Sequence, residues 1–102
     1  MLNFELSPGA EHDLEDIIRY TAEQWGAEQV RKYTQALEQC IIRLAKGEGY
    51  YKAVDDLYPN MRLVRCQHHY IFGVIRTDLP MLVVAIFHKH MDLILQLKNR
   101  LD

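Results

Sequence analysis

The sequence predicts an α+β domain in which a hairpin of two helices covers one face of a small, largely antiparallel sheet. Two long stretches with helical spacing of apolar residues follow each other with only a short connection, which favours an antiparallel helix pair. Three shorter stretches of strand-like composition come next, and a third helical stretch ends the sequence. Because strands and helices are grouped, with one strand ahead of the helices, the expected order is β-α-α-β-β-β-α.

The length of 102 residues is typical of one domain, which we expect to span residues 1–102. Hydrophobic residues make up 49% of the chain and charged residues 25%. Both values are ordinary for a globular protein and argue against disorder as the default state.

The first elements are a strand and a helix. Apolar and polar residues alternate over Leu2–Leu6, which is the period of a half-buried strand. Ser7 and Pro8 follow as a helix N-cap and first helical residue, and Gly26 ends the helix. The apolar positions of this helix recur in steps of three and four, at Ala10, Leu14, Ile17, Ile18, Thr21 and Trp25.

A second helix is predicted over Ala27–Lys46, with Gly47 as its C-cap. Its apolar stripe consists of Val30, Tyr33, Leu37, Cys40, Ile41 and Leu44. A loop then extends to Asn60.

Three strands are predicted after the loop, over Arg62–Gln67, His69–Arg76 and Leu82–His88, with a turn at residues 77–80. The continuous apolar run Leu82–Phe87 indicates a central strand that is covered on both faces.

The last helix is predicted over Met91–Leu101, and it carries apolar side chains on more than one side. Such surface either packs on the protein's own sheet or forms a groove for a partner.

Charge is distributed unevenly along the chain. Residues 1–59 hold eleven acidic against six basic side chains, whereas residues 60–102 hold six basic against three acidic ones. The basic half therefore suits an acidic partner, but the total charge of −2 is too weak for general nucleic-acid binding.

The two cysteines, Cys40 and Cys66, show neither metal-site nor secreted-protein spacing. The first residues do not form a signal peptide, and no apolar run is long enough to cross a membrane. We therefore expect a cytoplasmic protein without membrane association, with both thiols reduced.

Five motifs occur in a characteristic order along nearly the whole chain. They are Leu6–Ile17, Tyr20–Gly26 (Y-T-x-x-x-W-G), Leu57–Arg62, His69–Phe72 (H-x-I-F) and Ile86–Asp92 (I-F-H-x-x-M-D). Together they resemble the RelE/ParE toxin superfamily, and within it the ParE branch. Arg65–Tyr70 (R-C-x-H-H-Y) is similar to plasmid-type ParE toxins in particular.

This resemblance implies a toxin of a type II toxin–antitoxin system. Its expected partners are DNA gyrase, which it would inhibit by protein binding, and a ParD-like antitoxin, which would neutralise it. It implies no enzymatic activity, no cofactor and no sequence-specific nucleic-acid binding by the toxin alone.

Ribosome-dependent cleavage of messenger RNA, as in RelE, is the alternative. A general base, a general acid and cations would be needed. The side chains that could supply them are Arg62, Arg65, His69, His88 and His90. The lack of a pronounced positive charge and the tyrosine- and aspartate-containing loop at residues 50–56 favour the non-nuclease interpretation, so we assign no catalytic residue.

A metal site is considered and rejected. His88, His90 and Asp92 have suitable ligand chemistry, as do Cys66 and His68, but the first group lies at a junction of strand and helix and no second ligand pair has finger-like spacing.

We expect partner binding instead. The candidate contact residues are Arg62, Arg65, His69, His88, His90, Asp92, Leu93 and Leu97. Among the aromatic residues, Trp25 and Tyr33 are expected to be packing residues, whereas Tyr50 and Tyr51 could equally be contacts.

Overall fold

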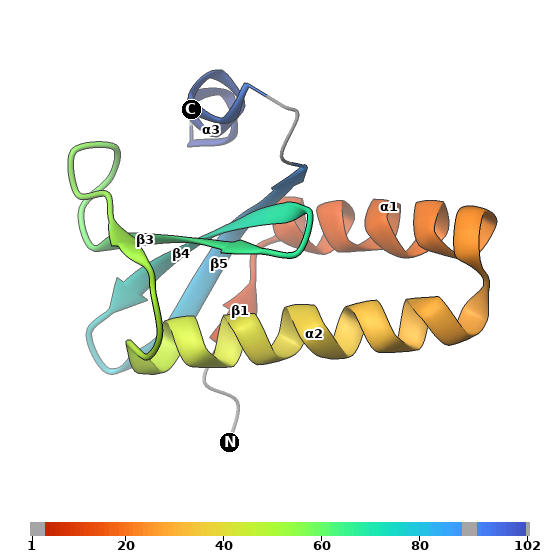
Figure 1. Ribbon diagram of the computed structural model, residues 1–102. Coiled ribbons are helices and arrows are strands. Elements are labelled where there is room, and N and C mark those ends of the chain that lie inside the picture. The colour runs from red at the N-terminus through yellow and green to blue at the C-terminus, as the bar shows by residue number, and fades with distance from the viewer. Residues whose placement is uncertain (1–3, 89–91, 102) are drawn as a thin grey trace.

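The structure is a computed structural model that describes residues 4–88 and 92–101. These residues form a helical hairpin, a five-stranded sheet and a shorter C-terminal helix (Figure 1). In chain order the elements are β1 (Phe4–Leu6), α1 (Pro8–Trp25), α2 (Ala27–Lys46), β2 (Lys52–Ala53), β3 (Met61–Cys66), β4 (His69–Arg76), β5 (Leu79–His88) and α3 (Leu93–Leu101). The predicted α+β class and element order are confirmed.

The ends of the hairpin follow from single residues. The Ser7 hydroxyl accepts a hydrogen bond from the backbone N–H of Ala10 at 3.1 Å, which caps α1. Gly26 separates the two helices with a φ of 89°, and Gly47 ends α2 in the left-handed region with a φ of 73°. Only glycine adopts these backbone angles without strain, so the predicted helix boundaries are confirmed.

The sheet has the strand order β1-β5-β4-β3-β2. β1 runs parallel to β5, and the other neighbouring strands are antiparallel. β5 begins at Leu79, earlier than predicted, because the chain reverses within Thr77 and Asp78, where Asp78 has a φ of 60°. β2 was not predicted, because this two-residue strand has both side chains exposed and therefore carries no hydrophobic pattern.

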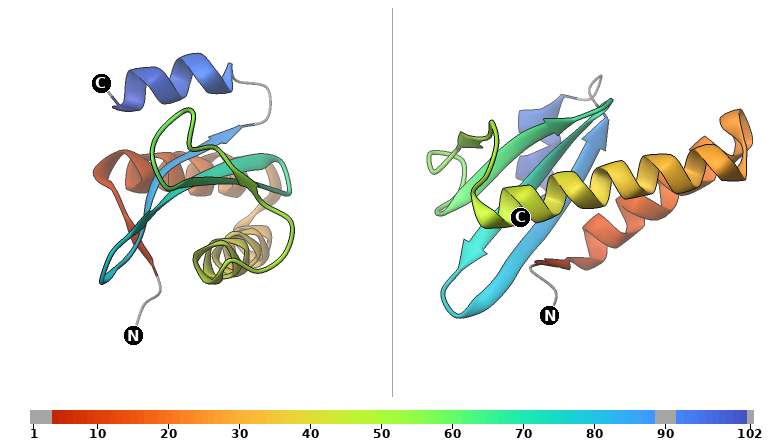
Figure 2. Two further views of the ribbon diagram at one scale, coloured as in Figure 1. Left: turned by 90° about the vertical axis from the view of Figure 1, so that its left-hand side faces the viewer. Right: turned by 60° about the horizontal axis from the view of Figure 1, so that its bottom comes forward.

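Both faces of the sheet are covered (Figure 2). The hairpin packs on one face around Ile71, Val83 and Ile86, and α3 packs on the other around Phe72 and Ala85. The prediction that the run Leu82–Phe87 is covered on both faces is thus confirmed. No helix among the described residues is long and apolar enough to cross a membrane.

A β-bulge at Val84 changes which face the β5 side chains occupy. Phe72 pairs with Ala85, and Gly73 pairs with Val83, so Val84 has no partner on β4. β5 therefore has one residue more than β4 between these two pairs, and its side chains no longer alternate strictly between the two faces of the sheet. As a result, Val83 belongs to the hairpin-side core while Val84 and Ala85 belong to the α3-side core.

The expectation of two reduced thiols is wrong for this structure. Cys40 of α2 and Cys66 of β3 are joined by a disulfide, with their Cα atoms 6.3 Å apart. The sequence did not reveal the pair, because the two residues are 26 positions apart and meet only when α2 packs on the sheet.

Candidate partner-binding groove

A groove of about 980 Å³ lies between the helical hairpin and the start of β4 and end of β5. Its walls come from α1, the start of α2, the β3–β4 turn, the end of β5 and α3. We call it the hairpin groove. Aromatic side chains, including Tyr20, Trp25 and Tyr33, and the imidazoles of His68, His69 and His88 line it.

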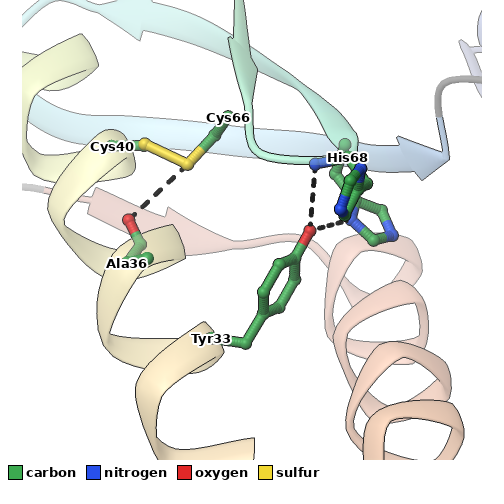
Figure 3. Close-up of a disulfide and its surroundings, with 6 residues drawn as sticks. Tyr33, Ala36, Cys40, Cys66 and His68 are labelled. Atoms are coloured by element: carbon green, nitrogen blue, oxygen red, sulfur yellow. Dashed lines mark hydrogen bonds between the residues drawn. A yellow bond between two sulfur atoms is a disulfide. The ribbon is translucent and has the colours of Figure 1, made fainter. Parts of the chain in front are cut away.

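Tyr33 connects α2 to the β3–β4 turn at one wall of the groove (Figure 3). Its hydroxyl oxygen accepts a hydrogen bond from the backbone N–H of His68 at 3.3 Å. The same hydroxyl lies 2.6 Å from Nδ1 of His69. The Tyr33 side chain can therefore donate to an unprotonated Nδ1 while accepting from the turn.

The environment of His69 favours its neutral form. The pKa of His69 is lowered to about 4, chiefly by burial and next by the neighbouring imidazoles of His88 and His68, against an opposing effect of Asp13. The rings of His69 and His88 meet edge to face, with centroids 5.4 Å apart. At neutral pH, His69 is thus a neutral imidazole rather than a cation, and its Nδ1 accepts from Tyr33 in the tautomer that carries the proton on Nε2.

Asp13 and Arg100 close the far side of the groove, where β5 extends beyond its short neighbour β1. Asp13 Oδ2 accepts a hydrogen bond from the backbone N–H of Ile86 at 3.0 Å, and Arg100 Nη1 donates to the Val84 carbonyl at 2.9 Å. Arg100 also binds both carboxylate oxygens of Asp13 at 2.9 Å. An ion pair therefore satisfies the backbone groups that β1 leaves open at this edge.

This ion pair also fixes α3 to α1. The Arg100 guanidinium lies 5.1 Å from the centre of the Phe87 ring, and its hydrogen bond to Asp13 raises the pKa of Arg100. A side chain at Gly9 would place its Cβ 2.7 Å from Arg100 Nη1, so a glycine leaves the necessary space on α1. Neither charged residue was predicted to take part in the site, because the two are 87 positions apart and meet only in the folded chain.

Only part of the predicted contact set lies together. His69 and His88 both line the hairpin groove. Arg65 pairs with Tyr70 and Cys66 pairs with His69, so Arg65 and His69 point to opposite faces of the sheet. Of the side chains considered for RNA cleavage, Arg65 and His69 therefore do not lie at one site.

Arg62 has a structural role at the opposite end of β3. Its Nη1 donates to the carbonyl of Leu44 at 2.8 Å, near the C-terminus of α2, where a cation is favourable. Its guanidinium also stacks 4.8 Å from the centre of the Tyr51 ring. Of the two loop tyrosines, Tyr51 thus packs internally, whereas Tyr50 is fully exposed.

The predicted contacts on the last helix are divided between core and surface. The Asp92 carboxylate accepts a hydrogen bond from the backbone N–H of Leu95 at 3.2 Å and so caps α3. Leu97 is only 1% exposed because its side chain fills the α3-side core, so it offers no surface to a partner in this conformation and is not kept as a proposed contact. Leu93 is half-buried against the same core, and the exposed apolar surface of α3 is formed by Ile94 and Leu95 instead. The predicted contact His90 lies outside the described residues.

The two aromatic residues that were predicted to pack, Tyr33 and Trp25, lie in different environments. Tyr33 packs against the hairpin-side core, as predicted. Trp25 is 72% exposed, so the prediction that it packs is wrong. It ends α1 at the tip of the hairpin, which projects beyond the sheet (Figure 1), and its helical spacing alone could not indicate where the sheet ends.

Comparison with known proteins places this architecture in a family. The model of the ParE toxin of the type II toxin–antitoxin system parDE matches residues 4–93. A Toxin ParE of Escherichia coli is 52% identical over 101 residues, which cover 99% of this chain and 98% of the relative. A Toxin ParE1 of Mycobacterium tuberculosis is 31% identical over 87 residues, covering 85% of this chain and 89% of the relative.

A solved structure of the chromosomal ParDE system from P. aeruginosa has the same fold, with a TM-score of 0.68 and 15% identity, covering 86% of this chain and 96% of that chain. The family model and the near full-length relatives lead to one conclusion: this chain is a member of the ParE toxin family of type II toxin–antitoxin systems.

Proposed function

We propose that this ParE-family toxin inhibits DNA gyrase by stoichiometric protein binding and that a ParD-like antitoxin neutralises it. The observation that carries the proposal is the match to ParE toxins along nearly the whole chain. Because gyrase acts on the chromosome and on plasmids, the proposed site of action is the cytoplasm.

The state of the ionisable groups in the hairpin groove supports binding over catalysis. Asp13 is held by Arg100 and by the backbone of β5, and His69 is held by Tyr33. A general base must be able to reach a substrate proton, whereas Asp13 and His69 are each already bound to another side chain of the protein. The aromatic and polar lining of the groove is instead typical of a protein-binding surface.

The proposed contact surface follows from exposure. Tyr20 and Trp25 are 62% and 72% exposed at the groove, and exposed aromatic side chains of this kind often dominate binding energies. From the set expected on sequence grounds, we retain Arg65, His69, His88, His90, Asp92 and Leu93 as proposed contacts. An acidic antitoxin segment would meet the exposed guanidinium of Arg65, since that of Arg62 is bound to α2.

Expression in cells tests the proposal against its alternatives. We expect growth arrest, relaxed plasmid DNA and intact messenger RNA after induction, with all three effects reversed by co-expression of the antitoxin. Fragmented messenger RNA with normal plasmid supercoiling would replace the proposal with RelE-like cleavage. Normal growth without antitoxin would indicate a toxin fold that has lost its target.

A further inference from the structure

The disulfide joins the hairpin to the sheet beside the hairpin groove. Cys66 is 3% exposed at the end of β3, whereas Cys40 is half-buried at the edge of the hairpin-side core. Their Cα separation of 6.3 Å lies within the range that a disulfide spans. Cys40 is therefore the more accessible of the two cysteines to a small thiol from solution.

The bond lies in a row of contacts between α2 and the β3–β4 turn (Figure 3). Tyr33, Ala36 and Cys40 follow one another at helical spacing on α2. Tyr33 holds the backbone of His68, and Cys66 pairs directly with His69 across β3 and β4. The covalent link thus reinforces the wall of the groove that Gln67, His68 and His69 form.

The surroundings of Cys66 also suit the open, dithiol state. Its Sγ lies 3.6 Å from the carbonyl oxygen of Ala36. A disulfide sulfur carries no proton, so this contact becomes an S–H···O hydrogen bond only when the disulfide is open. Both cysteines also pack in the hairpin-side core, where a free thiol behaves as a small apolar group.

We propose that Cys40 and Cys66 form a reversible thiol–disulfide pair, closed by a low-molecular-weight disulfide such as oxidised glutathione, whose closure fixes the β3–β4 turn against α2. This cysteine pair acts as a modification site that sets the rigidity of one wall of the hairpin groove. Its consequence for partner binding rests on the proposed function, whereas the chemistry and the change in rigidity do not.

The exchange proceeds through the accessible cysteine. The Cys40 thiolate attacks one sulfur of the small disulfide, which forms a mixed disulfide and releases one small thiolate. The Cys66 thiolate then attacks the Cys40 sulfur, closes the protein disulfide and releases the second small thiolate. The two protons lost by the protein thiols are taken up by the two small thiols, so one disulfide is consumed and one is formed.

Equilibration of the isolated toxin in glutathione buffers tests the chemistry. We expect both cysteines to be closed in a buffer dominated by oxidised glutathione and open in one dominated by the reduced form, as measured by alkylation and mass spectrometry. Opening should lower the melting temperature by on the order of 15 °C and leave the chain folded. Thiols that stay open in the oxidised buffer, or a reduced chain that is unfolded, would overturn the proposal.

Backbone ¹⁵N relaxation tests the change in rigidity, at a temperature where both forms are folded. In the closed form we expect order parameters of ~0.85 at Gln67 and His68, and values below ~0.75 in the open form. The β4–β5 turn at Thr77 and Asp78 is the internal control, because it lies at the other end of β4 and should not respond. Equal order parameters at residues 67 and 68 in both forms would contradict the proposal.

The variant Cys40→Ala removes the accessible thiol and leaves Cys66 in the core. We expect it to behave as the open form in both buffers. If its β3–β4 turn were as ordered as that of the closed wild type, the disulfide would not be what fixes the turn. None of these measurements uses gyrase or antitoxin, so they succeed or fail independently of the proposed function.

Discussion

Replacing Arg100 by alanine should destabilise the chain more than any other change to a charged side chain that we consider. Arg100 donates to both oxygens of Asp13 and to the Val84 carbonyl, and its side chain is 28% exposed against 12% for Asp13. Hydrogen bonds that involve a charged group contribute about 1.5–3 kcal/mol each when buried. Partial solvent access and the option of rehydration reduce the summed effect, so we expect a loss of about 2–3 kcal/mol in the free energy of unfolding.

Urea denaturation at neutral pH measures this loss, and a double-mutant cycle with Asp13→Ala assigns it to the pair. We expect a coupling energy of about 1.5–2 kcal/mol. Arg100→Lys keeps the charge but loses the forked geometry, so it should recover only about half of the loss. The matched control is Arg31→Ala, which breaks the exposed pair with Glu28 and should cost less than about 0.5 kcal/mol.

Two results would refute this reasoning. The first is a stability of Arg100→Ala within the range of the Arg31→Ala control. The second is strict additivity of the Asp13 and Arg100 changes, because it would mean that the two side chains do not stabilise each other.

Three further predictions concern stability. The pKa of His69 is about 4 in the folded chain, below its unfolded value, so the unfolded chain binds the proton more readily. The free energy of unfolding should therefore fall as the pH drops from about 6.5 to about 4. Urea midpoints measured across this range should show the fall, and His69→Gln should flatten it. Gly9→Ala should lower the free energy of unfolding by about 1 kcal/mol in the wild type. It should cause no loss in the Arg100→Ala background, where the space beside residue 9 is free. An equal loss in both backgrounds would contradict the steric explanation. In urea denaturation, Leu97→Ala should lower the free energy of unfolding by about 2–4 kcal/mol, and the exposed Leu95→Ala by less than about 0.5 kcal/mol. Similar losses for the two variants would contradict the burial of Leu97 and the exposure of Leu95.

Local signals made the helices predictable. Ser7 and Pro8 begin α1, and Gly26 and Gly47 end the two long helices, because caps and left-handed positions depend on the identity of single residues. The apolar run of β5 likewise predicted a strand buried on both faces. Only the short β2 and the first residues of β5 escaped. β2 carries no hydrophobic pattern, and Leu79 and Pro80 were assigned to a turn that the chain completes within Thr77 and Asp78.

The site was less predictable, because its contacts join residues distant in the sequence. Asp13 and Arg100 are 87 positions apart, and their ion pair exists only because β1 is too short to cover the whole edge of β5. The disulfide depends in the same way on how α2 meets β3.

Helical phase was a further source of error. In the short helix α3, several leucines compete for the buried side, and spacing alone did not distinguish Leu97, which is buried, from Leu95, which is exposed. At Trp25 the spacing was right but the sheet ended before it.

The most direct measurement of the central claim is a titration of purified DNA gyrase with this chain in a supercoiling assay on relaxed plasmid. We predict complete inhibition near stoichiometric amounts of toxin, and full recovery of supercoiling when the antitoxin is added in equimolar amount to the toxin. A double variant that truncates the exposed groove aromatics, Tyr20→Ala with Trp25→Ala, should need more protein for the same inhibition while keeping the wild-type fold. Undiminished supercoiling, with no cleaved gyrase–DNA complex at large toxin excess, would contradict the account.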